Sequence, residues 1–180
     1  MDSDEKQFDI INKAAHYNKH PSGVECIELA ERLPFNTGNA FKYVFRRGDK
    51  GNTVQDLEKA IYYLNREVQQ LRSLIRWRTA SEVQNMKCND HFTLTDVKNI
   101  GQVFTAEPNK FAAVVYSRIF ARDASITVYI DGLTRSCECV EHLIAEVTNG
   151  LEPEPVPDPN VSFAKTVFPS GAVHPDWKKG

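Results

Sequence analysis

The sequence predicts a mainly α-helical protein, with a core of three helices at about residues 23–33, 37–47 and 53–77 and a smaller α+β part near the C-terminus. Three observations support this class. Apolar residues recur at spacings of three and four, which is the helical period. Residues that end or start helices, such as Pro34 and Thr53, separate the three segments. One later run alternates in the manner of a strand.

The chain divides into four parts by composition: an N-terminal arm at residues 1–15, a helical domain at 16–78, an α+β extension at 79–150, and a linker and tail at 151–180. The linker is recognised by four prolines within residues 151–160, a density typical of extended, polyproline-like chain. With 180 residues and 41% apolar side chains, the rest of the chain can bury a core.

The first predicted helix carries two carboxylates, Glu25 and Glu28, three positions apart and therefore neighbours on one helical turn. Mg²⁺ prefers hard oxygen ligands and usually takes one or two from the protein, so this pair is a candidate metal site. The alternative is structural: Ser22 and Glu25 have the spacing of a capping box, and acidic side chains complement the positive end of a helix dipole.

The second predicted helix buries one apolar face and leaves Asn39, Lys42, Tyr43 and Arg46 on another strip. Basic residues are concentrated near its end, and arginine matches phosphate oxygens with two parallel hydrogen bonds. Basic groups at a helix C-terminus also interact favourably with the dipole, which is the alternative explanation. The candidate phosphate-binding residues are Asn39, Lys42, Arg46, Arg47 and Lys50.

The third predicted helix has a seam of apolar residues between Leu57 and Ile75 at spacings of four and three, indicating either core or a homo-oligomer interface. Three residues flank this seam and could contact a ligand bound between helices: Asp56, Lys59 and Tyr63. Asp56 also lies three residues after Thr53, so capping is an equal alternative for it.

Beyond residue 78 the pattern is weaker. Thr93 or Thr95 is a candidate cap for a helix before residue 104. Residues 125–130 alternate and are β-branched, which predicts a strand that pairs with residues 112–116. Residues 137–147 are expected to form a closing helix that ends at Asn149-Gly150.

Composition excludes several classes of protein. A net charge of −2 and a pI near 6.2 argue against a dedicated nucleic-acid binder. No apolar run reaches the roughly 18 residues of a membrane span, and four irregularly spaced cysteines without a signal peptide indicate a reducing cytoplasm. Cys88-x-x-His91 and Cys137-x-Cys139-x-x-His142 match no common zinc module, and the Walker sequence GxxxxGK[ST] does not occur.

The central stretch, residues 16–68, resembles a family of short phage-encoded nucleotide kinase-like proteins that have no P-loop. The resemblance is carried by His16-Tyr17, HPSGVECIE from His20, FNTGNAFKY from Phe35, Arg46-x-Gly48-x-Lys50, and DLEKAIYYL from Asp56. It implies phosphoryl transfer from ATP or another nucleoside triphosphate to a deoxynucleoside monophosphate, in an oligomer in the cytoplasm of the phage's host.

Phosphoryl transfer depends mostly on positioning and charge neutralisation, which assigns roles to the candidate residues. Lys42, Arg46 and Lys50 are expected to hold phosphates, and Glu25, Glu28 and Asp56 to organise Mg²⁺. Lys59 or His20 would assist the transferring group. Two alternatives are an all-α Mg²⁺-dependent nucleotide pyrophosphatase, for which Glu25-x-x-Glu28 is half of the usual carboxylate set, and a non-catalytic protein that binds a nucleotide or a host enzyme.

Overall fold

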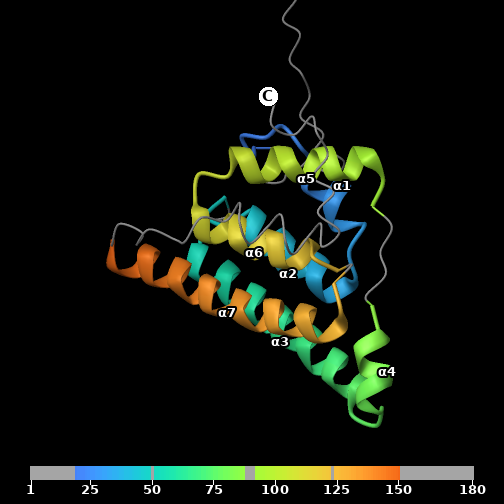
Figure 1. Ribbon diagram of the computed structural model, residues 1–180. Coiled ribbons are helices and arrows are strands. Elements are labelled where there is room, and N and C mark those ends of the chain that lie inside the picture. Colours follow the sequence, from blue (N-terminus) through green and yellow to red (C-terminus); the bar gives the residue numbers. More distant parts are fainter. Residues whose placement is uncertain (1–18, 50, 88–91, 123, 151–180) are drawn as a thin grey trace, which may run out of the picture.

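The computed structural model describes residues 19–49, 51–87, 92–122 and 124–150. These residues form seven helices (Figure 1): α1 (Cys26–Ala30), α2 (Phe35–Phe45), α3 (Thr53–Ile75), α4 (Ala80–Asn85), α5 (Leu94–Ala106), α6 (Lys110–Phe120) and α7 (Ile126–Asn149). The prediction of a mainly helical protein is confirmed. The N-terminal arm, Lys50, Cys88, His91 and the Pro-rich linker lie outside the described residues.

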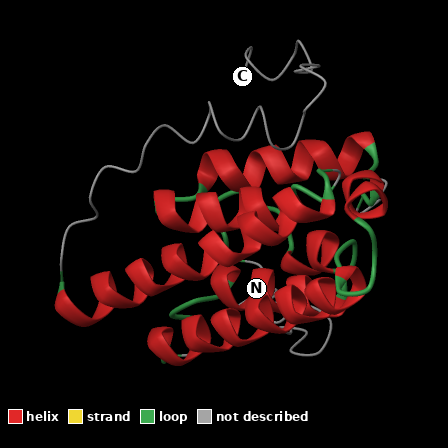
Figure 2. Ribbon diagram, turned by 60° about the horizontal axis from the view of Figure 1, so that its bottom comes forward, coloured by secondary structure: helices red, strands yellow, loops and turns green. Residues whose placement is uncertain are grey.

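The helices stack in three levels, each made of two helices in contact: α1 with α5, α2 with α6, and α3 with α7 (Figure 1). Figure 2 shows the same helices from another side, with only loops between them. α2 also packs on α3, and α6 on α7. None of the described helices is long and apolar enough to cross a membrane.

The apolar seam of α3 is mostly core. Leu57 and Leu64 have no exposed surface, while Val68 and Leu71 are 4% and 7% exposed. These side chains are buried within a single chain, because α3 packs on α2 along one side and on α7 along another. These four side chains are therefore core, whereas Ile61 and Ile75 of the same seam are only partly buried. The homo-oligomer expected through residues 57–75 stays a prediction.

The predicted strand at residues 125–130 is wrong. Ser125 is the N-cap of α7, and the following residues belong to a helix that continues to Asn149. Its buried side chains, Ile126, Tyr129, Ile130 and Leu133, recur at spacings of three and four, so one helical face enters the core. The predicted partner at residues 112–116 lies in α6. The α+β part is therefore absent from the described residues, whereas the helix end at Gly150 is confirmed by its left-handed φ of 61°.

Two of the predicted capping boxes do not form. α1 starts later than expected, with Glu25 at its N-cap but without a side-chain cap, and the Ser22 hydroxyl accepts a hydrogen bond from the Val24 N–H instead. α3 is capped by Asn52, whose side chain accepts from the Gln55 N–H, so Asp56 is not a capping residue. Thr93 does cap α5, as expected.

Gly38 sets the distance between α1 and α2. A Cβ at this position would lie 2.8 Å from the Ala30 carbonyl oxygen and 3.6 Å from Leu33 Cβ. We expect Gly38→Ala to reduce the free energy of unfolding by about 1–3 kcal/mol, the usual effect of overpacking. The measurement is urea denaturation followed by circular dichroism.

Gly101 provides the matched control for Gly38. It lies inside α5, where an added Cβ would meet nothing within 4 Å. Gly101→Ala is expected to stabilise the protein by about 0.5–1 kcal/mol, because alanine loses less backbone entropy in a helix. Equal effects of the two substitutions would contradict a close α1–α2 contact at Gly38.

Candidate functional site

Three cations surround the ring of Tyr43 on α2. The Lys42 and Lys59 Nζ atoms lie 4.8 Å and 5.6 Å from the ring centroid, and the Arg46 Cζ atom lies 4.6 Å from it. Lys42 and Arg46 belong to the strip that the helical period predicts, whereas Lys59 reaches the ring from α3. Such distances allow cation–π attraction, and they bring three positive charges together at one place. We call these four residues the Tyr43 cluster.

Arg46 is held by a buried ion pair. Its Nη2 donates to the Asp56 Oδ1 over 2.9 Å, and the two residues are 8% and 4% exposed. The second carboxylate oxygen of Asp56 makes no hydrogen bond within the described part of the chain. One edge of the Arg46 guanidinium is bonded to Asp56, so that edge is not available to a phosphate. The main contribution of Arg46 to this cluster is therefore its positive charge next to the Tyr43 ring.

Lys42 and Lys59 are only partly buried. Lys42 Nζ donates to the Asn39 Oδ1 over 2.6 Å, and the Asn39 amide in turn donates to the Phe35 carbonyl. Lys59 Nζ donates to Gln55 Oε1 over 3.2 Å, and no described carboxylate pairs with it. Lys42 and Lys59 are thus the two partly exposed cations of the Tyr43 cluster, whereas Arg46 is buried.

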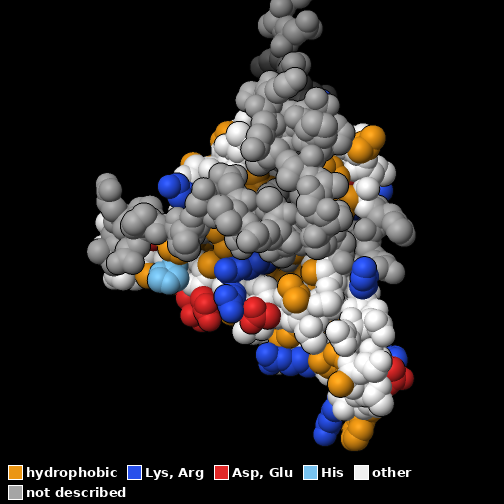
Figure 3. All heavy atoms as spheres, in the orientation of Figure 1, with side chains coloured by type: hydrophobic (Ala, Val, Ile, Leu, Met, Phe, Trp, Pro, Cys, Tyr) orange, Lys and Arg blue, Asp and Glu red, His pale blue; other side chains and the backbone are white. Residues whose placement is uncertain are grey.

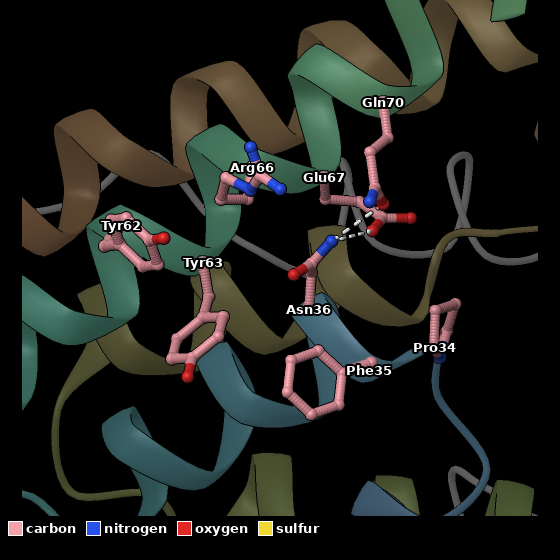
Figure 4. A pocket seen from close by; sticks show the side chains of 8 residues that line it. All are labelled: Pro34, Phe35, Asn36, Tyr62, Tyr63, Arg66, Glu67 and Gln70. Atoms are coloured by element: carbon pink, nitrogen blue, oxygen red, sulfur yellow. Dashed lines mark hydrogen bonds between the residues drawn. The ribbon is translucent and has the colours of Figure 1, made fainter.

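The aromatic surface continues from Tyr43 along the α2–α3 groove. Tyr63 stacks on Tyr43, with ring centroids 5.9 Å apart and an interplanar angle of 15°, and Phe35 meets Tyr63 edge-on at 5.9 Å. This surface opens into a pocket of about 370 Å³ (Figure 4), which we call the α2–α3 pocket. Its lining residues are Pro34, Phe35, Asn36, Tyr62, Tyr63, Arg66, Glu67 and Gln70.

A second charged cluster lies on the other side of α2 and consists of His20, Arg47 and Glu107. Arg47 donates to both carboxylate oxygens of Glu107, over 2.7 Å and 3.4 Å, and His20 Nε2 lies 3.5 Å from Glu107 Oε2. The Glu107 side chain has no exposed surface. Burial alone would raise its pKa, but hydrogen bonds from His20 and Arg47 and the positive charge of Arg47 lower the pKa to about 2.

The candidate residues His20 and Arg47 are therefore separated from Lys59 and Asp56. His20 also bonds to the Ser22 hydroxyl over 2.8 Å and stacks on Phe45 at 4.5 Å. Phe45 belongs to the α6-facing side of α2, whereas Tyr43 faces α3. Both Nη atoms of Arg47 already donate to Glu107, so a phosphate would have to displace that carboxylate. Sequence reasoning missed Glu107, because a single acid in a loop before a proline carries no pattern.

The candidate metal residue Glu28 contacts a helix other than α2 and α3, which carry the Tyr43 cluster. Glu28 is exposed and accepts a hydrogen bond from Asn99 of α5 over 3.2 Å. The described residues contain no group of three or more potential metal ligands. The Mg²⁺ site expected at Glu25 and Glu28 stays a prediction.

The cysteine and histidine residues of α7 do not converge either. Arg118 donates to the Cys139 sulfur over 3.1 Å, Cys137 Sγ contacts the Leu133 carbonyl at 3.7 Å, and the His142 ring stacks on Phe111 at 4.9 Å. Burial raises the pKa of Cys137 to about 11, so its thiol stays protonated near neutral pH. The pattern that suggested zinc thus has structural explanations at these three positions.

The face shown in Figure 3 carries interspersed positive and negative side chains on its uncovered part, without a continuous basic patch.

Comparison with known proteins gives one match. Residues 11–65 match the model of a family described as a protein of unknown function (DUF3310). No curated protein and no solved structure matches the chain significantly. The matched segment contains α1, α2 and the first half of α3, and hence every residue of the Tyr43 cluster. The chain is therefore similar, over these helices, to a family to which no activity has been assigned.

Proposed function

We propose that this protein binds a nucleotide at the Tyr43 cluster and transfers a phosphoryl group from a nucleoside triphosphate to a deoxynucleoside monophosphate. The observation that carries the proposal is the convergence of Lys42, Arg46 and Lys59 on one tyrosine ring at the α2–α3 groove. Capping and helix-dipole effects do not require cations from two helices to meet at one place. The resemblance to phage nucleotide kinase-like proteins supplies the reaction.

In this reaction a phosphate oxygen of the monophosphate attacks the γ-phosphorus, the bond to the leaving diphosphate breaks, and two diphosphates are formed. The protein contributes charge and position. Lys42 and Lys59 would contact the phosphate oxygens through their ammonium groups, and Arg46, held by Asp56, would add charge from behind. Mg²⁺ would supply further charge neutralisation when it arrives bound to the triphosphate.

The test is a kinase assay on purified protein with ATP-Mg²⁺ and each deoxynucleoside monophosphate, with products separated by chromatography. We expect one or more monophosphates to be converted to diphosphate. Lys59→Met is expected to lower kcat/KM by about 100-fold, the scale for losing one charged donor at a transferring phosphate. Lys98→Met, on the exposed surface of α5, should leave kcat/KM unchanged.

A ring substitution tests the cluster by a different route. Tyr43→Phe keeps the aromatic face and should bind nucleotide like the wild type, whereas Tyr43→Leu removes that face and should weaken binding by roughly tenfold. Titration calorimetry measures both. Complete absence of diphosphate product from all four monophosphates, in a preparation free of host kinase, would disprove phosphoryl transfer.

A second candidate is nucleotide binding without turnover. It is favoured by the placement of Glu28, whose described hydrogen bond joins it to α5, and by the use of Asp56 as the partner of Arg46. Tight binding that is insensitive to EDTA, with no product, would support it. The pyrophosphatase alternative needs several converging carboxylates, and the described residues do not bring such a group together.

A further inference from the structure

We infer that the α2–α3 pocket receives the nucleobase of the nucleotide whose phosphates lie at the Tyr43 cluster. This inference rests on the proposed function and adds a specific place for the base. A volume of about 370 Å³ is near the lower end of the range for ligand pockets, about 300–1,000 Å³, and suits one flat ring system rather than a whole nucleotide.

The polar wall of the pocket contains two buried side chains, Asn36 and Glu67, and their hydrogen bond fixes the orientation of the Asn36 amide. Asn36 Nδ2 donates to Glu67 Oε2 over 3.1 Å and to Gln70 Oε1 over 2.8 Å, and Asn36 and Glu67 are 7% and 5% exposed. Because a carboxylate only accepts hydrogen bonds, the amide nitrogen of Asn36 must face Glu67. The Asn36 oxygen then points to the opposite side, as Figure 4 shows.

This wall has the chemistry that a base edge requires. The Asn36 oxygen is an acceptor for an exocyclic or ring N–H, and the Gln70 amide nitrogen and the Arg66 guanidinium are donors for a base carbonyl or ring nitrogen. The edges of nucleobases present such donors and acceptors side by side.

The other walls are aromatic and exposed. Phe35 and Tyr62 are 74% and 60% exposed, although each flanks the pocket. Tyr63 lies between them, edge-on to Phe35 at 5.9 Å and to Tyr62 at 5.3 Å. Exposed aromatic rings around a polar wall form a surface on which a base can stack, and stacking on aromatic side chains accepts every base.

The pocket and the Tyr43 cluster are parts of one groove. Tyr63 lines the pocket and also stacks on Tyr43. α2 and α3 are antiparallel: Arg46 bonds Asp56 at one end of their contact, and Asn36 bonds Glu67 at the other. A nucleotide lying along this groove would have its base at the Asn36 end and its phosphates at the Lys42 and Lys59 end.

The test compares ligands with and without a base by titration calorimetry: the four deoxynucleoside monophosphates, ATP, free deoxynucleosides, and inorganic tripolyphosphate. Phe35→Ala is expected to weaken binding of nucleotides and nucleosides by about tenfold and to leave binding of tripolyphosphate unchanged. Lys59→Met should weaken binding of tripolyphosphate and nucleotides, but not of nucleosides. Leu74→Ala, on an exposed position of α3 outside the pocket, should change nothing.

The outcomes separate this inference from the proposed function. Nucleotide binding that is unaffected by Phe35→Ala and by Arg66→Ala overturns the base pocket and leaves the kinase proposal standing. Equal weakening of tripolyphosphate by Phe35→Ala also overturns it, because the effect would not depend on a base. Binding of nucleosides that Phe35→Ala abolishes, without any binding of tripolyphosphate, supports the base pocket and overturns the phosphate site at Tyr43.

Discussion

Replacing Glu107 with glutamine is expected to reduce the free energy of unfolding by about 3–5 kcal/mol at pH 7, the scale for breaking a buried ion pair from one side. The Glu107 side chain has no exposed surface. It accepts hydrogen bonds from both Nη atoms of Arg47, from His20 and from the Asn109 N–H. A neutral amide would leave the Arg47 charge without its counter-ion. Urea denaturation followed by circular dichroism measures the loss.

The pH dependence of stability gives a second readout for Glu107. Its pKa in the folded protein is about 2, below the ordinary value of 4.5 for a glutamate side chain. The unfolded chain therefore binds a proton first as the pH falls, and the stability from Glu107 is present above about pH 4.5 and lost towards pH 2. Glu107→Gln should remove this part of the acid-induced loss.

Glu58 supplies the control for this experiment, because it is an exposed carboxylate on α3. Glu58→Gln should change the free energy of unfolding by less than about 0.5 kcal/mol and leave its pH dependence unchanged. Parallel stability curves for the wild type and Glu107→Gln between pH 2 and 4.5 would show that Glu107 does not contribute as a buried anion.

The sequence predicted the helices whose apolar period is long and whose ends are marked. α2 and α3 start and end within two residues of their predicted bounds, because Pro34 and the turn before Thr53 interrupt the helix and the apolar face continues between them. α7 was missed in its first turns because β-branched residues dominate there. Their intrinsic preference is weak, and burial of Ile126, Tyr129 and Ile130 against α6 outweighs it.

The candidate site was predicted in part. The helical period places Lys42, Tyr43 and Arg46 on one strip, and the structure adds Lys59 from α3 at 5.6 Å from the Tyr43 ring. The helical periodicity of the sequence does not predict which neighbouring group a polar side chain will bond. Asp56 had an equally good capping partner in the sequence and pairs with Arg46 instead. The pocket was not predicted, because Asn36 and Glu67 are 31 residues apart and meet only when α2 and α3 pack.

Removal of the Asp56 carboxylate should have an effect as large as that at Glu107. Asp56→Ala leaves the Arg46 guanidinium buried at 8% exposure without its carboxylate, and we expect a loss of about 3–5 kcal/mol in the free energy of unfolding. Arg46→Met with Asp56→Leu replaces the pair by apolar side chains of similar size. This double variant should recover most of the lost stability, since apolar replacement of a buried ion pair is often neutral.

The double variant also tests what the Arg46–Asp56 pair does in the proposed reaction. If the pair only adds positive charge behind Tyr43, the double variant should retain phosphoryl transfer, with nucleotide affinity reduced because that charge is missing. If the pair takes part in the transfer itself, turnover should disappear although the protein is folded and binds nucleotide. Measuring stability, affinity and turnover on the same preparation therefore assigns the pair either to charge and positioning or to the reaction itself.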